Sequence, residues 1–127
     1  MSNRSYGNVY PISSAQTLRE SDSGSVFLVR KGSAYTITLP TPSEDAAGCH
    51  YRFINADASN NIVTITGGAS TAYGVIDLSG SVIPTGTASV KFAGTAARGD
   101  FIDCVCDGTV YYYSAGSSTA AGITTAS

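Results

Sequence analysis

The sequence predicts an all-β fold: a single-domain β-sandwich or small barrel of about eight short antiparallel strands that follow an N-terminal arm. Two observations support this prediction. Runs rich in Val, Ile, Thr, Tyr and Phe recur along the chain, as expected of strands, and turn-forming Gly, Pro, Asn, Asp and Ser separate them at short intervals. The chain has 127 residues, which suffice for one hydrophobic core but not for two.

Residues 1–16 are predicted to form the polar arm. Their apolar side chains are isolated, and Pro11 interrupts any regular run. We expect the arm to become ordered on a partner surface, where it is anchored by Tyr6, Val9, Tyr10 and Ile12. No apolar segment follows Arg4 as in a secretory signal, and no run approaches the ~20 apolar residues that span a bilayer. We therefore expect synthesis in a cytoplasm and no membrane segment.

The β-domain is predicted to span residues 17–114. Its eight expected strands cover residues 25–30, 34–39, 49–55, 61–66, 73–78, 87–92, 100–106 and 109–114. One helix-compatible stretch interrupts them, where Ser43 can cap a single turn and Gly48 can end it.

The dipeptide Asp107-Gly108 lies between two strand-like runs and predicts a two-residue hairpin. In that hairpin Cys104 faces Tyr111, and both faces are largely apolar, whereas a strand with one solvated face alternates cleanly. Either loops or a second subunit must cover the outer face, and we favour a subunit in a homo-oligomer. The expected interface residues are Val105, Val110 and Tyr112.

Residues 115–127 are predicted to form a C-terminal tail rich in Gly, Ser, Thr and Ala. Such small residues bury little area, so the tail is either flexible or an extended segment that lies on a neighbouring molecule. Ile123 is its one apolar anchor.

The composition excludes some classes of partner. Charged residues make up 13% of the chain, against roughly 25% in an ordinary soluble domain, and the net charge is −2. The seven cations are scattered, so no basic patch for nucleic acid is expected. A weakly charged, hydroxyl-rich surface is typical of a protein that packs against copies of itself or a protein partner.

The three cysteines form an odd-numbered set, which argues against a disulfide framework. Cys104 and Cys106 point the same way in a strand, and their spacing does not suit a zinc site with a single available histidine. We expect small buried thiols, with a disulfide or a metal site as the alternatives.

We predict no catalytic residue, cofactor, metal or small-molecule substrate, and hence no enzyme. His50 alternates with Arg52 along a strand and has no carboxylate to orient it, and no G-x-S-x-G elbow is present. The acids lie at turns and strand edges, without the spacing of a calcium loop. The tripeptide Arg98-Gly99-Asp100 matches a known integrin ligand, but a turn before the next strand is the ordinary explanation.

Three segments carry a family resemblance: Asp22-Ser-Gly-x-x-Phe-x-Val, Tyr35-x-Ile-x-Leu-Pro-x-Pro and Gly48-x-x-Tyr-x-Phe-Ile. Together they resemble the head decoration (cement) proteins of tailed bacteriophages, especially marine ones. The segment from Gly99 to Tyr112 is similar to the closing hairpin of those proteins, although Val110-Tyr111-Tyr112 stands where a Trp is common. Ala121-Gly-Ile-Thr is also similar to their tail.

The resemblance implies a homotrimer on the capsid exterior. Such a trimer sits at three-fold and quasi-three-fold positions of the virion, clamps neighbouring major-capsid subunits and carries no catalytic residues. The alternative is a virion fibre, receptor-binding or other tail module, which would present an aromatic or polar site near Tyr73 or residues 111–113.

Overall fold

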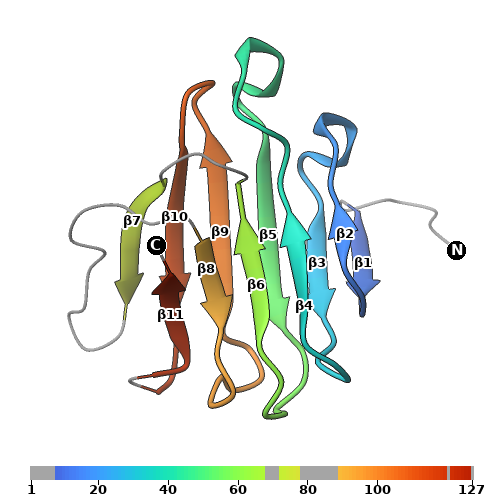
Figure 1. Ribbon diagram of the computed structural model, residues 1–127, viewed down its shortest axis with the longest axis vertical. Helices are drawn as coiled ribbons and strands as arrows, with labels where there is room; N and C mark the ends of the chain where they lie inside the picture. The colour runs from blue at the N-terminus through green and yellow to red at the C-terminus, as the bar shows by residue number, and fades with distance from the viewer. Residues whose placement is uncertain (1–7, 68–71, 78–88, 120, 127) are drawn as a thin grey trace, which may run out of the picture.

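The computed structural model describes residues 8–67, 72–77, 89–119 and 121–126, which form two packed β-sheets (Figure 1). Sheet A contains, in spatial order, β1 (Val9–Ile12), β3 (Val26–Val29), β5 (His50–Asn55), β9 (Phe101–Cys106), β10 (Tyr111–Gly116) and β7 (Ala72–Asp77). Sheet B contains β11 (Ile123–Ala126), β8 (Ser89–Phe92), β6 (Val63–Thr66), β4 (Tyr35–Thr38) and β2 (Gln16–Thr17). The predicted all-β sandwich is confirmed, and each of the eight expected strands is present with its ends displaced by two residues or fewer.

The predicted number and direction of the strands are wrong. The described residues form eleven strands, and five of the nine pairings among these strands are parallel. From β1 to β6 the chain alternates between the sheets, so each strand lies beside the one two steps earlier and runs in the same direction. This half is a two-sheeted solenoid of three turns. The remaining strands mostly add to it in antiparallel fashion.

Stacked inward-facing residues hold the solenoid turns together. Tyr10, Phe27 and Phe53 occupy equivalent positions on β1, β3 and β5. The Phe27 and Phe53 rings stack with centroids 5.4 Å apart, and Tyr10 lies 6.1 Å from Phe27. Both phenylalanines are buried, and burial of one such side chain contributes about 1.5–3 kcal/mol. The ladder therefore favours this register among β1, β3 and β5.

The predicted arm and tail contribute strands to the domain, so the boundaries at residues 16 and 115 do not separate them from it. β1 pairs with β3, where Val26 N–H donates to Asn8 O and Arg30 N–H to Ile12 O, both at 2.8 Å. β11 pairs with β8, and Ile123 lies in the core. The isolated apolar residues of these polar segments suggested anchors on a partner surface. An edge strand, however, can also join a sheet with only one or two side chains that point into the core.

The β9–β10 hairpin is present, but its turn contains four residues rather than two. The Asp107 carboxylate accepts from Thr109 N–H at 2.8 Å and from Val110 N–H at 2.9 Å, which closes the longer loop. Tyr111 therefore pairs with Cys106 and Tyr112 with Val105. A displacement of two residues leaves every side chain on its predicted face, because the strand period is two.

The predicted helical turn is confirmed as a short 3-10 turn, η2 (Glu44–Ala46), and a similar turn, η1 (Glu20–Asp22), precedes β3. Ser43 Oγ accepts from Ala46 N–H at 3.3 Å. Gly48 has a φ of +87°, which favours glycine, and its N–H donates to Cys106 O at 2.8 Å. The turn thus delivers the chain directly into β5.

Candidate functional site

The outer face of sheet A carries an exposed apolar patch at its β7–β10–β9 end. The patch consists of Tyr73 (44% exposed), Val75 (53%), Val105 (43%) and Tyr112 (45%). Tyr73, Tyr112 and Val105 lie in one row across the three strands, and the two tyrosine rings are 6.4 Å apart. Neighbouring positions in register therefore make one continuous surface rather than scattered exposed residues.

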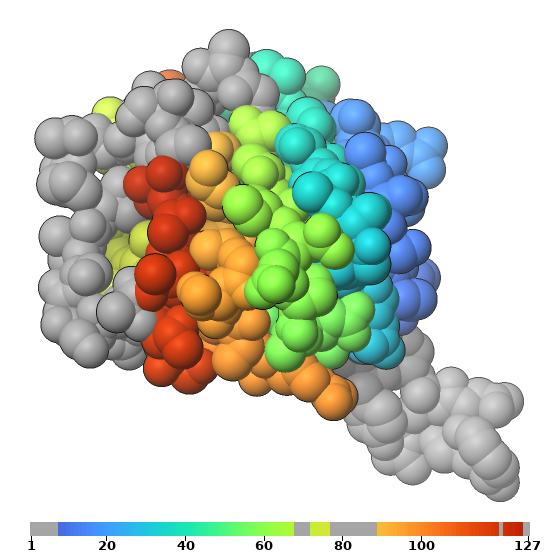
Figure 2. Space-filling model, turned by 60° about the horizontal axis from the view of Figure 1, so that its bottom comes forward, coloured from blue at the N-terminus to red at the C-terminus, as the bar shows by residue number. Residues whose placement is uncertain are grey.

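The outer face of sheet B differs in chemistry. Figure 2 shows this face from β2 in blue to β11 in red as one broad surface. Thr36, Thr64, Lys91 and Thr124 lie in one row across it. Thr is common on solvated strands, so this polar row is that of an ordinary exposed face. The contrast marks the apolar patch of sheet A as the unusual surface.

An ion pair lies beside the apolar patch. Arg52 Nη1 is 2.8 Å from Asp103 Oδ2, and the guanidinium lies 4.7 Å from the centroid of the Phe101 ring. Burial raises the pKa of the Asp103 carboxyl, and the positive charge of Arg52 offsets part of that rise. Both side chains are partly exposed, so the pair adds little stability. Its effect is to orient a donor and an acceptor beside the apolar patch.

The outer face is hollowed above β3, β5, β9 and β10. The depression has a volume of about 490 Å³, and the side chains around it include Val26, His50, Arg52, Asp103 and Tyr112. His50 Nδ1 lies 3.3 Å from Gly48 O, and the structure places no carboxylate against the ring among the described residues. The depression therefore offers both apolar packing and polar contacts to a partner surface.

The structure brings two of the three predicted interface residues together. Val105 and Tyr112 are direct cross-strand neighbours on the outer face, whereas Val110 is half-buried in the β9–β10 turn. Val75 was missed, and Tyr73 was expected only as a site of the alternative fibre or receptor-binding module. Their alternation in the sequence indicates a shared face, but nothing in the sequence shows that β7 pairs in parallel with β10.

The predicted arm residues have three different outcomes. Val9 (57% exposed) and Tyr10 (47%) lie on the surface. Ile12 is 2% exposed and belongs to the core beside Val29, so its prediction as a surface anchor is wrong. Tyr6 lies outside the described residues.

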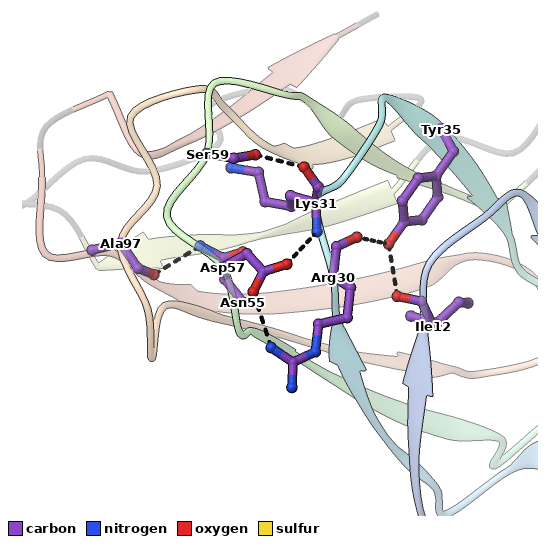
Figure 3. Close-up of polar contacts among 8 residues, drawn as sticks. All are labelled: Ile12, Arg30, Lys31, Tyr35, Asn55, Asp57, Ser59 and Ala97. Atoms are coloured by element: carbon purple, nitrogen blue, oxygen red, sulfur yellow. Dashed lines mark hydrogen bonds and ion pairs between the residues drawn. The ribbon is translucent and has the colours of Figure 1, made fainter.

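A polar cluster joins the solenoid to the antiparallel strands (Figure 3). Lys31 is fully buried, and its Nζ donates to Ala93 O at 2.9 Å. Its N–H donates to Asp57, and its carbonyl accepts from Ser59 Oγ at 2.6 Å. Burial lowers the pKa of Lys31, and the charges of Asp100 and Asp57 offset part of the change. In the sequence Lys31 directly follows Arg30, and nothing there marks it as a buried residue.

We expect Lys31→Ala to lower the free energy of unfolding by about 2–4 kcal/mol, because it leaves a cavity and an unpaired Ala93 carbonyl. Lys31→Met is the matched variant, since it keeps most of the volume and removes a desolvated charge, and it should cost clearly less. Urea unfolding measures both values. Equal losses for the two variants would show that the ammonium contact, rather than the packed stem, makes the contribution.

The remaining chemical candidates, the three cysteines and Asp100, are buried. Cys49, Cys104 and Cys106 are free and buried, as predicted, and burial raises the pKa of Cys104. Among the described residues, no group of three or more His, Cys, Asp or Glu side chains could hold a metal ion. Asp100 is buried and accepts from Ala97 N–H at 2.9 Å and Ser118 N–H at 3.1 Å, so the Arg-Gly-Asp tripeptide does not present its acid.

Comparison with known proteins identifies no relative: no family model matches the chain, and no curated protein is significantly similar to it. No helix among the described residues is long and apolar enough to cross a membrane.

Proposed function

We propose that this chain is a capsid decoration (cement) protein, which binds the outside of a phage head as a homotrimer and stabilises the major-capsid lattice without catalysis. The observation that carries the proposal is the apolar patch on sheet A. Soluble monomers seldom expose a large contiguous apolar surface, and one that is rimmed by polar residues typically marks an interface. The sequence resemblance to phage decoration proteins supplies the partner.

The two exposed surfaces have separate roles in this proposal. The apolar patch, with Tyr112 at its centre between Val105 and Tyr73, packs against a neighbouring copy, and the Arg52–Asp103 pair lies at its rim. Val9 and Tyr10 on β1 contact the shell. A trimer then touches several capsid subunits at once, and linked weak contacts give it avidity. Because it binds the assembled lattice rather than free subunits, it shifts the equilibrium toward the intact shell.

We expect the charge-bearing variant Tyr112→Lys to convert the trimer into monomers without a large loss of monomer stability, because the side chain is exposed within the subunit. Light scattering at micromolar concentration measures the molar mass. Thr36→Lys on the outer face of sheet B is the matched control and should remain trimeric. Wild-type protein that is monomeric under these conditions would exclude the trimeric cement function.

Shell binding is a second, separate test. The purified chain is mixed with heads that lack it, and bound protein is measured after sedimentation. We expect the wild type to bind and to raise the temperature at which the heads rupture. Failure of a trimeric wild type to bind these heads would refute the decoration role.

A virion fibre or receptor-binding module is the second candidate, and the exposed Tyr73–Tyr112 pair favours it, since adjacent exposed aromatics suit recognition of a ligand. The copy number per virion separates the two functions. Hundreds of copies support a cement protein, whereas a handful supports a fibre.

A further inference from the structure

Two of the three buried cysteines lie opposite each other on neighbouring segments of sheet A. The β5–β9 pairing places His50 opposite Val105, so one further step along the register places Cys49 opposite Cys106. Two backbone hydrogen bonds continue the ladder there: Cys106 N–H donates to Cys49 O at 2.9 Å, and Gly48 N–H donates to Cys106 O at 2.8 Å. The two cysteines are therefore direct cross-strand neighbours.

Both of these side chains belong to the core between the sheets. Cys49 shares the inner face with the buried Tyr51, and Cys106 shares it with the buried Cys104. The Cα atoms of opposite residues in an antiparallel pair are about 4.5–5.5 Å apart. A disulfide usually joins residues whose Cα atoms are about 4.4–6.8 Å apart. The position of Cys49 opposite Cys106 therefore suits a disulfide bond.

Cys104 is less well placed to bond with either of the other cysteines. It lies opposite Tyr51, and its Sγ is 3.7 Å from Tyr51 O. Residues two apart on one strand, such as Cys104 and Cys106, have Cα atoms about 6.6–6.8 Å apart, at the upper limit for a disulfide. Diagonal neighbours, such as Cys49 and Cys104, are about 7–8 Å apart and exceed that limit. The strand register thus favours one pair of the three.

Cys49 is the thiol that a small oxidant reaches first. It is 7% exposed, against 3% for Cys104 and 1% for Cys106. It lies between the short turn η2 and the first residue of β5, and the ends of strands open more readily than their centres. Burial raises the pKa of the Cys104 thiol, which keeps that group protonated and unreactive.

In the reduced protein each of the two sulfurs has a weak contact of its own. Cys49 Sγ lies 4.0 Å from Glu20 O, and Cys106 Sγ accepts from Gly108 N–H at 3.3 Å. A thiol is a weak donor and a weak acceptor, so rotation of the two side chains toward each other breaks only weak interactions. The existing contacts therefore offer little resistance to an S–S bond.

We propose that Cys49 and Cys106 form a disulfide within the folded chain when it meets an oxidising environment, with a small-molecule disulfide such as oxidised glutathione as the oxidant. The deprotonated sulfur of Cys49 attacks one sulfur of the oxidant and releases the other half as a thiolate. The sulfur of Cys106 then attacks Cys49 in this mixed disulfide and releases the second half. Two protein thiols are thereby oxidised, the oxidant is reduced to two thiols, and the two cysteine protons pass to them.

The bond joins the two halves of sheet A. β5 belongs to the solenoid, and β9 is the antiparallel strand that pairs with it. A covalent link across this seam restricts the unfolded chain, and the effect grows with the length of the loop that it closes. Thiols stay free in a reducing cytoplasm, whereas disulfides persist outside it. We therefore expect the link to form after release from a cell, and this inference does not depend on the proposed decoration role.

Oxidation of the purified, folded chain tests this inference. Reduced protein is incubated with oxidised glutathione and then unfolded in denaturant that contains N-ethylmaleimide, which labels and counts the free thiols. Proteolysis and mass spectrometry locate any S–S bond. We expect one free thiol, at Cys104, and a pair of peptides joined through Cys49 and Cys106. The oxidised protein should melt several degrees above the reduced protein.

Cys104→Ala and Cys106→Ala are matched variants, because each removes a buried thiol from the same face of β9. Cys104→Ala should keep the cross-link and the gain in melting temperature, whereas Cys106→Ala should lose both and retain glutathione on Cys49. Three free thiols in the oxidised wild type, or a bond that involves Cys104 or joins two chains, overturns this inference. The wild-type result decides even if Cys106→Ala does not fold. Light scattering and head binding test the proposed function separately.

Discussion

Above pH 10 the protein is expected to lose stability steeply, because the fold raises the pKa of several buried tyrosines. Burial raises the pKa of Tyr35 to about 12 and raises those of Tyr51, Tyr111 and Tyr113 further. In the unfolded chain these phenols ionise near pH 10, so above that pH the unfolded state binds fewer protons than the folded state. Their contribution is complete below pH 10 and is lost as the pH rises toward the folded values.

The size of this effect is large relative to the stability of a small domain. The shift of the partly buried Tyr35 corresponds to about 1–2 kcal/mol once solvent screening is allowed for, and a domain is typically stable by about 5–15 kcal/mol. Tyr111 Oη donates to Pro40 O at 2.6 Å and Tyr51 Oη to Arg19 O at 2.9 Å. A phenolate at either place would oppose a carbonyl oxygen that it cannot bond. We therefore expect cooperative unfolding before these groups titrate in the native state.

Lys31 acts in the opposite direction. Its folded pKa is lowered, so the unfolded chain holds the extra proton between that value and about 10.5, and this group adds stability as the pH rises through the interval. Because one lysine opposes several tyrosines, the free energy of unfolding still falls as the pH rises above about 10. Melting temperatures at a series of pH values, together with tyrosinate absorbance, measure the balance.

Tyr111→Phe should flatten the alkaline decline, at the cost of the hydrogen bond to Pro40 O. Tyr112→Phe removes an exposed phenol, whose pKa is raised chiefly by the charge of Asp107, and solvent screening makes its effect smaller. Stability that stays constant up to pH 12 in the wild type would contradict the burial of the phenols.

Local features of this fold are readable in the sequence, whereas its topology is not. Val, Ile, Thr and Tyr runs located the eight strands from β3 to β10, and Ser43 and Gly48 located the short helical turn. Turn residues mark where the chain bends but not whether it returns to the same sheet or crosses to the other. From β1 to β6 the chain crosses to the other sheet after every strand, so the strands that pair within each sheet are parallel. No turn signal in the sequence encodes this crossing.

The same limit applies to the candidate surfaces. Side-chain alternation placed Val105 and Tyr112 on one face, and that face survived a change in the hairpin register. The contribution of Tyr73 and Val75 depends on a parallel pairing between distant segments. Ile12 was predicted to be a surface anchor but is buried. One apolar residue in a polar stretch suits a surface anchor and an edge strand equally, and only the packing of Ile12 against Val29 distinguishes the two.

Gly74→Ala is expected to detach β7 from sheet A and thereby remove half of the apolar patch. A Cβ at Gly74 would collide with Tyr113 O and lie 2.7 Å from Tyr113 C, and both are backbone atoms of β10 that cannot move aside. The six-residue pairing of β7 with β10 cannot accommodate the methyl group. Loss of this pairing exposes backbone groups and core residues, and we expect the free energy of unfolding to fall by more than about 3 kcal/mol.

Gly32→Ala is the matched control, because a Cβ there meets no atom within 4 Å, and it should be neutral or slightly stabilising. Hydrogen exchange locates the defect: amides of β7 and the facing edge of β10 should lose protection in Gly74→Ala, while β1 to β6 retain it. If the patch is the subunit interface, this variant also loses the trimer, because Tyr73 and Val75 leave the surface that Val105 and Tyr112 complete. A variant that loses β7 protection but stays trimeric would place the interface elsewhere on the fold, and wild-type stability would show that β7 does not pair with β10.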